Sequence, residues 1–413
     1  MRNQLLFLLL ATACGVPDKS DGDTAADTDT DTDADTDTDT DTDTDTIDDG
    51  SLHPPIIEGS EGDFYADGTV QAIQLVISEV GMQALRDDPG TWVEAEFIWE
   101  GRRYGPVGVR IKGENSLRGI DEKPSLKVKF SEYQEDGRFM GLRALTLNNM
   151  VSDPSMLRER MAYKVFREHG SPAPRCNHAT VTLNDIPYGL YANVENTDEE
   201  LLQEWFADWE GPMWEIHDAD FRPGLDAGFE NEEGEDDRTQ IAALTLALQG
   251  ADSTVRMFDY VHQDAWYAYF TTMAWIGNLD GYPFSEPGDD AHLYLDPTDG
   301  LFHFIPHGLD ETFLDDAGVE FVMHGILATA CMGEPVCKAD WRTRLAATNE
   351  ASAALNLGAY LHDVAAEIDA YGDADLKKEY SDADVDAARA FVLAYIEGRP
   401  AYIAEQLTWD SLR

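Results

Sequence analysis

The segment from Trp275 to Asp296 reads WIGNLDGYPFSEPGDDAHLYLD and joins two apolar stretches through a polar insertion. This insertion contains Asn278, Asp280, Asp289 and Asp290. A second insertion follows in FHFIPHGLDETF, where Asp310 comes directly after another strand-like stretch. Folding gains nothing from acids at the ends of buried segments, because carboxylates lose hydration there. The pattern therefore indicates a site at which carboxylate oxygens bind a ligand.

The composition fits a folded protein with a sizeable core. The chain has 413 residues, of which 43% are hydrophobic and 10% aromatic. Its formal net charge of −52 comes in large part from one tract between Asp18 and Gly50. The rest of the chain is also acidic and shows no basic footprint, so nucleic acid is not an expected partner.

The N-terminus MRNQLLFLLLATACG has the pattern of an export signal. One arginine precedes a short apolar run that is too short for a permanent membrane span. We interpret residues 1–13 as a signal peptide and Cys14 as a lipidated residue, because ATAC is similar to a bacterial lipobox. Ordinary cleavage near the same point is the alternative. The expected location is the outer membrane or cell surface, with the lipid as the only membrane contact.

Residues 14–50 are expected to form a disordered, solvated tether. The Asp-Thr repeat has almost no apolar side chains, and its like charges repel one another. A calcium module is the alternative, but the tract lacks the internal glycine and closing glutamate of an EF-hand loop.

Three cysteines remain in the region after the tether. Cys331 and Cys337 flank the short segment MGEPV, and an exported protein can form disulfides, so we expect these two to be bridged. Cys176 is then left unpaired. No second pair has the spacing of a zinc site.

The order of the elements predicts a mixed α+β domain over residues 51–413. Apolar and polar residues alternate in strand fashion within 70–80, 91–113, 124–133, 143–149 and 178–196, and the first of these strands leads into a helix expected over 79–88. Helical periodicity predicts a main helix over 153–170, which begins after Asp153 and ends at Gly170. A strand-rich part, about 56–198, thus precedes a helix-rich part, about 199–413. In the second part we expect one long helix over 255–278, short strands at 291–296 and 301–307, and a helical tail.

Several motifs together resemble the spore coat protein H (CotH) kinase family. They are GVRIKGENS, SLKVKF, the stretch from LNNMVSDP to LYANVEN, GNLDGY and FIPHGLDETF. They occur in the family's order and span about residues 70–407. The resemblance implies a two-lobed fold like that of atypical protein kinases. It also implies transfer of phosphate from ATP to serine or threonine side chains of a protein substrate at the cell surface.

The resemblance also assigns residues to the phosphate donor. The loop KGENS, with Lys112, Gly113 and Ser116, offers backbone N–H groups to phosphates, although such a turn alone is commonly a plain hairpin. Family position favours Lys127 as the cation that faces the nucleotide; a solvated strand lysine is the alternative. Its acidic partner would be Glu159 on the main helix, unless Glu159 is an ordinary surface acid. Glu195 corresponds to the family's acid at the strand between the lobes.

Three acids complete the expected site. Asp280 resembles the catalytic-loop aspartate that orients the acceptor hydroxyl and takes its proton. Asp290 stands where the family has a metal-binding asparagine, and Asp310 resembles a metal-binding aspartate. The family motif PWDxD reads PHGLD here, a variant with Gly308 in place of the first aspartate; Asp290 would restore the charge. Oxygen ligands favour Mg²⁺ or Mn²⁺, with Ca²⁺ as a further candidate.

Two classes of function follow from these motifs. The first is an exported, membrane-tethered protein kinase. The second is a non-catalytic surface module, a pseudokinase that binds nucleotide, metal or an envelope partner. The loss of a carboxylate at Gly308 and the scarcity of ATP outside cells favour the second, whereas the retained lysine, helix glutamate and three acids favour the first. A hydrolase is not indicated, because no GxSxG or HExxH motif is present. The histidines at positions 292, 303 and 307 are interpreted as packed or exposed residues, with a transition-metal site as the alternative, because their spacing fits no helix pair of ligands.

Overall fold

Seven strands of the N-terminal part close into a barrel. The computed structural model describes residues 50–250, 252–314 and 323–410; Cys14 and the predicted tether lie outside them. The strand order is β5-β4-β3-β9-β10-β8-β6, and β6 pairs back onto β5. All neighbours are antiparallel except β3 and β9. The strands are β3 (Val70–Ile77), β4 (Val93–Trp99), β5 (Arg102–Lys112), β6 (Ser125–Lys129), β8 (Ala144–Asn148), β9 (Cys176–Leu183) and β10 (Ile186–Glu195).

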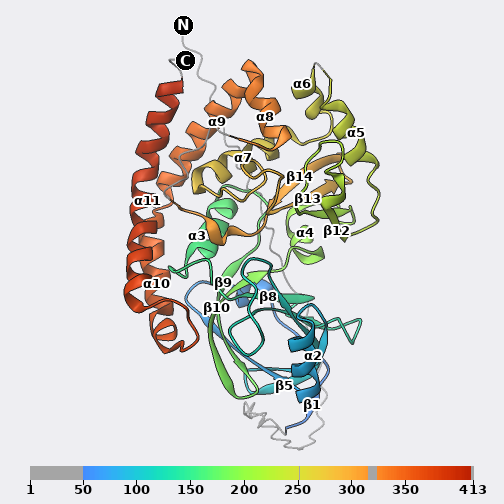
Figure 1. The fold of residues 1–413 in the computed structure, drawn as a ribbon, viewed down its shortest axis with the longest axis vertical. Helices are drawn as coiled ribbons and strands as arrows, with labels where there is room; N and C mark the ends of the chain where they lie inside the picture. Colours follow the sequence, from blue (N-terminus) through green and yellow to red (C-terminus); the bar gives the residue numbers. More distant parts are fainter. Residues whose placement is uncertain (1–49, 251, 315–322, 411–413) are drawn as a thin grey trace, which may run out of the picture. The chain divides into compact units, whose positions relative to one another are not determined.

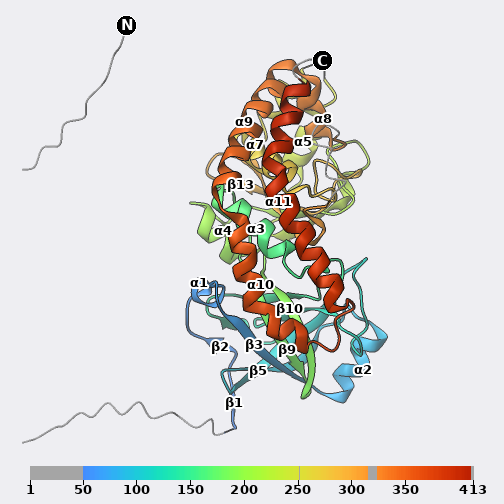
Figure 2. The same cartoon turned by 90° about the vertical axis from the view of Figure 1, so that its left-hand side faces the viewer.

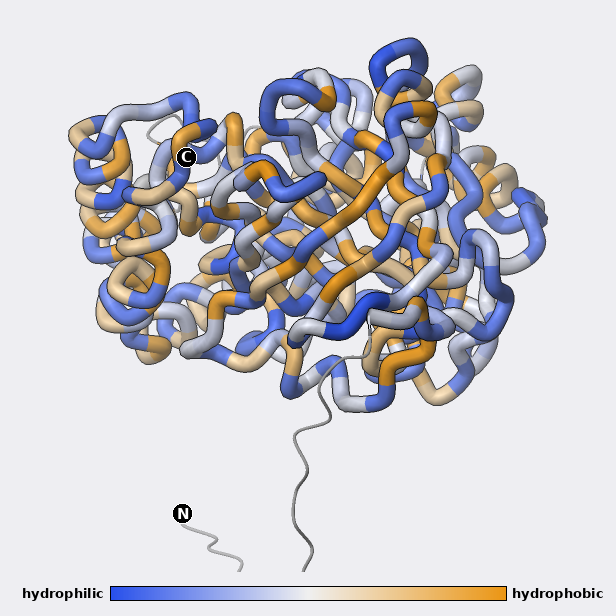
Figure 3. The backbone as a smooth tube through the Cα atoms, turned by 90° about the horizontal axis from the view of Figure 1, so that it is seen from below, coloured by the Kyte–Doolittle hydropathy of each residue, from blue (hydrophilic) through white to orange (hydrophobic). Residues whose placement is uncertain are grey.

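At β5 and β6 the barrel separates an apolar interior from a polar outer face. On β5 and β6, Val109, Ile111 and Val128 are fully buried in one core cluster, which is the interior of the barrel. The alternate residues Lys112 and Lys127 therefore point to the other side, because successive side chains of a strand face opposite ways. Figure 3 shows apolar and polar stretches alternating along the crossing strands. Short elements flank the barrel: β1 (Leu52–His53), β2 (Ile56–Ile57), α1 (Glu61–Phe64), α2 (Glu79–Asp87) and β7 (Arg138–Phe139).

The C-terminal part is helical with one small sheet, which confirms the mixed α+β class (Figure 1). The sheet has the order β12-β11-β13-β14. Its strands are β11 (Met213–Ile216), β12 (Phe229–Glu233), β13 (Ala291–Asp296) and β14 (Leu301–Pro306). The helices are α4 (Glu199–Trp205), α5 (Thr239–Ala247), α6 (Ser253–Met257), α7 (Gln263–Ile276), α8 (Ile326–Gly333), α9 (Pro335–Ala354), α10 (Leu357–Ala374) and α11 (Asp382–Asp410).

The long helix predicted over 255–278 is wrong, since the chain forms α6 and α7 with a break between them. His262 ends the break: its ring Nδ1 accepts a hydrogen bond from the N–H of Ala265 at 3.2 Å and so caps α7. The preceding Val261 forms a bridge with Phe302 of β14. Backbone pairing with the small sheet thus replaces a turn of helix that periodicity alone predicts.

The main helix predicted in the strand-rich part is shorter than expected and packs elsewhere. It is α3 (Arg158–Glu168), with α2 as a second helix of similar length in the same part. Met161, Val165 and Phe166 of α3 are buried in the same cluster as the helices of the C-terminal part. Asp153 still serves the start of α3, because its carboxylate accepts from the N–H of Arg158 at 2.8 Å. The helix therefore lies between barrel and helical part (Figure 1).

The C-terminal helices return to the barrel. α10 runs beside β10, and α11 runs beside α10 and α9 (Figure 2). Cys331 and Cys337 are joined by a disulfide at the junction of α8 and α9, and Cys176 is free and partly buried. Among the described residues, no helix combines the length and the apolar character that a bilayer span requires.

Candidate functional site

One cavity of about 390 Å³ lies between the polar face of the barrel and the helical part. Every residue that the sequence assigns to catalysis, nucleotide or metal binding lines it, although these residues are far apart along the chain. They are Lys112, Gly113, Ser116, Lys127, Glu159, Glu195, Asp280, Asp290 and Asp310. The structure thus brings the whole predicted set together on one concave surface.

The barrel wall of the cavity carries cations. Lys127 of β6 lies directly opposite Arg110 of β5, and Lys112 is two residues further along β5 on the same face. The side-chain ammonium of neither lysine forms a hydrogen bond or ion pair with another described residue. Burial lowers the pKa of Lys127, and the nearby charges of Lys112 and Arg110 lower it further. Cations that lack anionic partners and face a cavity are suited to phosphate.

The loop after α7 presents Asp280 to the cavity. α7 ends because Gly277 adopts a left-handed conformation with φ of +67°. The buried side chain of Asn278 then accepts from the N–H groups of Asp280 and Gly281, at 3.1 and 3.2 Å. Asn278 therefore fixes the turn that carries Asp280, whose own side chain is exposed to solvent.

Asp290 and Asp310 enter the cavity from the two ends of one hairpin. Asp290 precedes β13, and its carbonyl oxygen accepts from the N–H of His307 after β14 at 3.2 Å. Asp310 lies in a single 3₁₀ turn, Leu309–Glu311, which follows Gly308 in a left-handed conformation. The sheet pairing of β13 and β14 is therefore what places these two carboxylates near one another.

The carboxylates on the wall of the cavity opposite the lysines repel one another. Burial raises the pKa of Asp290 far above its usual value, and the charges of Asp289, Asp280 and Asp310 raise it further. Burial likewise raises the pKa of Asp310, and Asp280 adds to this. Mutual repulsion of buried carboxylates is relieved by a bound cation, and Mg²⁺ is commonly held by one or two carboxylates together with phosphate oxygens. The donor set fits such an ion.

The helix glutamate has a different neighbour from the one expected. Glu159 accepts a hydrogen bond from Asn148 at 2.7 Å and forms no ion pair with Lys127. The lysine whose charge acts on it is Lys112, which also acts on Asp310. The acids whose charges raise the pKa of Lys127 are Glu232 and Asp198. The expected ion pair of Lys127 with Glu159 is therefore not formed.

Glu195 faces the cavity but is already bound by a barrel residue. Its two carboxylate oxygens accept from the backbone N–H of Arg175 at 2.7 Å and from the Arg175 guanidinium. Only 1% of Glu195 is exposed. The resemblance leaves two roles open for Glu195, orienting the nucleotide or capping the connection between the lobes, and this contact fits the second better.

Sequence reasoning missed two strands and the acids they carry. β11 and β12 place Glu215 and Glu232 on the cavity wall. The alternation in MWEI is only four residues long, too short to distinguish a strand from a loop. His292 and His307, whose rings lie 4.8 Å apart, also line the cavity. Burial lowers the pKa of each to about 3, so both rings are neutral.

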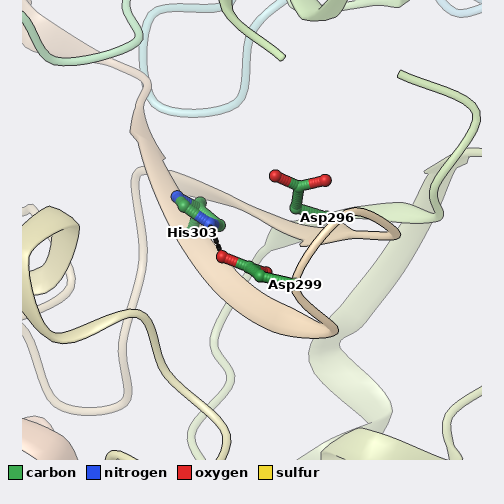
Figure 4. Close-up of side chains that lie close together, drawn as sticks. All are labelled: Asp296, Asp299 and His303. Atoms are coloured by element: carbon green, nitrogen blue, oxygen red, sulfur yellow. Dashed lines mark hydrogen bonds and ion pairs between the residues drawn. The ribbon is translucent and has the colours of Figure 1, made fainter. Parts of the chain in front are cut away.

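A different cluster comes closest to metal-ligand spacing. Among the described residues, Asp296, Asp299 and His303 form the one group of three such side chains whose ligand atoms all lie within 4.8 Å of one another (Figure 4). These acids already stabilise the turn between β13 and β14. Asp296 accepts from the N–H of Thr298 at 2.7 Å, and Asp299 from that of Leu301 at 2.8 Å. The cluster is thus explained by the turn and does not line the cavity.

Comparison with known proteins identifies the family. The model of the CotH kinase protein family matches residues 109–402, which include every residue of the predicted catalytic, nucleotide and metal set. The chain belongs to the CotH kinase family. The family is described as one of kinase proteins.

Two curated relatives of Bacillus subtilis (strain 168) are similar to this CotH family member. Inner spore coat protein H is 26% identical over 207 residues, which cover 46% of this chain and 55% of the relative. An inner spore coat protein H-like protein is 36% identical over 75 residues, which cover 18% of this chain and 23% of the relative. The chain therefore spans about half or less of the length of these relatives.

Proposed function

We propose that this protein is an exported, membrane-tethered atypical kinase that transfers phosphate from ATP to serine or threonine side chains of surface or secreted proteins. One observation supports this best: a single cavity has unpaired lysines on its barrel wall and crowded carboxylates on its opposite wall. Such a cavity matches a donor that is anionic along its phosphates and bound to a cation. The barrel and the helical part would be the two lobes of a kinase-like fold.

The residues of the chain would divide the work of phosphoryl transfer. Lys112 and Lys127 would neutralise phosphate oxygens from the barrel side, and the N–H groups of the loop at Gly113 would approach the same oxygens. Asp280, exposed at the cavity mouth, would orient the acceptor hydroxyl and take its proton. Its exposure is what a protein acceptor requires, since that acceptor has to arrive from solvent.

Asp290 and Asp310 would hold Mg²⁺ or Mn²⁺, with Ca²⁺ as a further candidate. When bound, the ion would draw charge from the phosphate oxygens during transfer. Glu159 would support the metal site indirectly, because α3 packs directly on the 3₁₀ turn that carries Asp310. The PHGLD motif would then be an active variant in which Asp290 supplies the carboxylate absent at Gly308.

The proposal also includes export of the protein and its attachment to a membrane by a lipid. The apolar run at residues 5–10 and the cysteine at position 14 support export and lipid attachment. The acidic tract that follows would hold the kinase away from the membrane surface and give it reach toward its protein substrates. Intact-protein mass spectrometry of material from a bacterial membrane fraction tests the lipid: an unmodified Cys14 at the mature N-terminus would refute it.

The activity is tested with purified protein, labelled ATP and either Mg²⁺ or Mn²⁺. The expected result is label on the protein itself or on a serine-rich acceptor. Asp280→Asn is the matched variant, because it keeps the size of the side chain and removes the base. It is expected to lower transfer by about 10²–10⁴-fold while nucleotide binding, followed by thermal shift, stays intact.

The experiment also separates the kinase from a non-catalytic module. A wild-type protein that shows a nucleotide-dependent thermal shift without transfer would be a pseudokinase. One that shows neither would not use this cavity for nucleotide at all. Asp310→Asn tests whether Asp310 is a metal ligand, since the substitution should weaken nucleotide binding only when Mg²⁺ or Mn²⁺ is present.

A further inference from the structure

The segment between α10 and α11 reaches back across the barrel. We call residues 375–380 the strap and the connection between β5 and β6, residues 113–123, the rim loop. The first part of the rim loop, Gly113 to Ser116, lines the cavity. The remainder of the loop faces the strap, and α10 brings the strap there along β10 (Figure 2).

The strap is anchored by Asp375. Only 4% of this residue is exposed, and its carboxylate forms an ion pair with the buried Lys123 of the rim loop at 2.6 Å. The same carboxylate accepts from the N–H of Leu190 at 3.0 Å. Gly189 makes room for it: a Cβ there would lie 2.1 Å from Asp375 Cγ. The backbone of β10 at Gly189 and Leu190 therefore provides both the space and a hydrogen-bond donor for the Asp375 carboxylate.

Two further strap residues hold the rest of the rim loop. The ammonium of Lys377 donates to the carbonyl oxygens of Asp121 and Glu122, at 2.9 and 2.6 Å. Glu379 takes both of its hydrogen bonds from the guanidinium of Arg118, at 2.5 and 3.0 Å. These contacts fix the backbone of the rim loop at several points between residues 118 and 123.

Asn149, at the end of β8, connects this anchored region to the cavity. Its side-chain amide donates to the carbonyl oxygen of Lys123 at 3.0 Å and to that of Ser116 at 3.1 Å. Only 6% of Asn149 is exposed, so these bonds are shielded from water. One buried amide thus ties the strap-held end of the rim loop to the end that lines the cavity.

We propose that the strap positions the rim loop for binding the phosphates of the nucleotide. The identity of the ligand in this inference rests on the proposed function. The claim that the strap holds the rim loop does not depend on it. Lys377 and the pair of Arg118 with Glu379 are positioning residues: they do not line the cavity and act through the backbone of the loop. Loosening them should weaken nucleotide binding and leave the chemical step nearly unchanged.

The test uses variants at the exposed edge of the strap, where folding is least at risk. Lys377→Met keeps the alkyl chain near Tyr188 and removes the bonds to the two carbonyls. Arg118→Glu and Glu379→Arg each break the ion pair, and the double exchange restores it with reversed polarity. The exchange of Arg344 with Asp264, an exposed ion pair between α9 and α7, is the matched control.

Two measurements decide the inference. In nucleotide-free protein, amide hydrogen exchange of residues 113–117 should become at least several-fold faster in Lys377→Met and in both single charge reversals. In kinetics, KM for Mg·ATP should rise about three- to tenfold with kcat within twofold. The double exchange of Arg118 and Glu379 should return both values toward wild type, and the control should change neither.

Each negative result has a distinct meaning. Unchanged exchange at 113–117 would show that the strap does not hold the loop and would overturn the inference. Faster exchange with unchanged KM would show that the loop is held but does not serve the nucleotide, which also overturns it. A wild-type protein without nucleotide binding would refute the proposed function instead, while the exchange data would still report on the strap.

Discussion

The carboxylate of Asp290 occupies the space in which a side chain at Gly308 would begin. A Cβ on Gly308 would lie 2.2 Å from Asp290 Oδ1, and Gly308 has a φ of +57°. Any larger residue at 308 therefore meets both a steric and a conformational obstacle. The family resemblance leads us to expect an asparagine and an aspartate at these two positions. The contact supports a relocation of the carboxylate rather than its loss.

Gly308 and Asp290 should therefore be energetically coupled. Gly308→Ala is expected to cost about 2–4 kcal/mol, since a clash with Asp290 adds to the left-handed backbone conformation. In an Asp290→Ala background the clash is gone, and the cost should fall to about 1–2 kcal/mol. Denaturant unfolding of the four proteins of this double-mutant cycle gives the coupling energy. Additive effects would show that the two positions do not compete for space.

The two cavity lysines should contribute unequally to phosphate transfer. The charge of Lys112 acts on Glu159 and Asp310, where the transferred phosphate would be, whereas the acids that act on Lys127 are Glu232 and Asp198. Lys112→Met is expected to lower kcat at least tenfold, and Lys127→Met to act mainly on KM for ATP. Steady-state kinetics of both variants decides this. A larger kcat loss in Lys127→Met would restore the role that family position gives to it.

Much of the fold could be predicted because its strands follow simple alternation. The segments that contain β3, β6 and β9 show one apolar face each, and the burial of those faces in one barrel is what fixes their pairing. The split between α6 and α7 was missed because its cause is a contact with β14, far away in the sequence. Helical periodicity continues through that break and gives no sign of it.

The sequence could predict which residues line the candidate site, but not which of these residues pair with one another. Asp280 and Asp310 follow apolar segments and Asp290 precedes one, which marks the region of the site, and the family resemblance selects these three acids within it. Which lysine approaches Glu159 depends on the closure of the barrel and on the position of α3, and neither is visible in local sequence. Glu215 escaped notice for the same reason: its strand is defined by its partners, β12 and β13.

The disulfide between Cys331 and Cys337 should stabilise the junction of α8 and α9. It closes a short loop with a sequence separation of 6, for which loop-closure entropy predicts about 2 kcal/mol. Replacing both cysteines by serine should lower the free energy of unfolding by about this amount under oxidising conditions. Wild type in a strong reductant should match the variant. Equal stability of wild type under both conditions would contradict the prediction.

His178 should make the protein less stable as the pH falls. Burial, reinforced by the charge of Arg160, lowers the pKa of His178 to about 3. Its ring is held between the Arg160 guanidinium and the carbonyl oxygen of Met156, at 3.1 and 2.8 Å. Below its ordinary pKa of about 6.5 the unfolded chain takes up a proton that the folded protein does not. Stability is therefore fully present above that pH and is lost toward pH 3.

The size of this effect can be isolated with His178→Gln, because glutamine can keep both hydrogen bonds and does not titrate. Between pH 6.5 and 5, wild type should lose about 1.6 kcal/mol of unfolding free energy relative to the variant, because the unfolded ring goes from half to almost fully protonated over that interval. Other groups titrate in both proteins, so their contributions cancel in the difference. His362→Gln, at an exposed position on α10, is the control and should follow wild type. If the difference between wild type and His178→Gln is the same at both pH values, the ring is not held neutral by the fold.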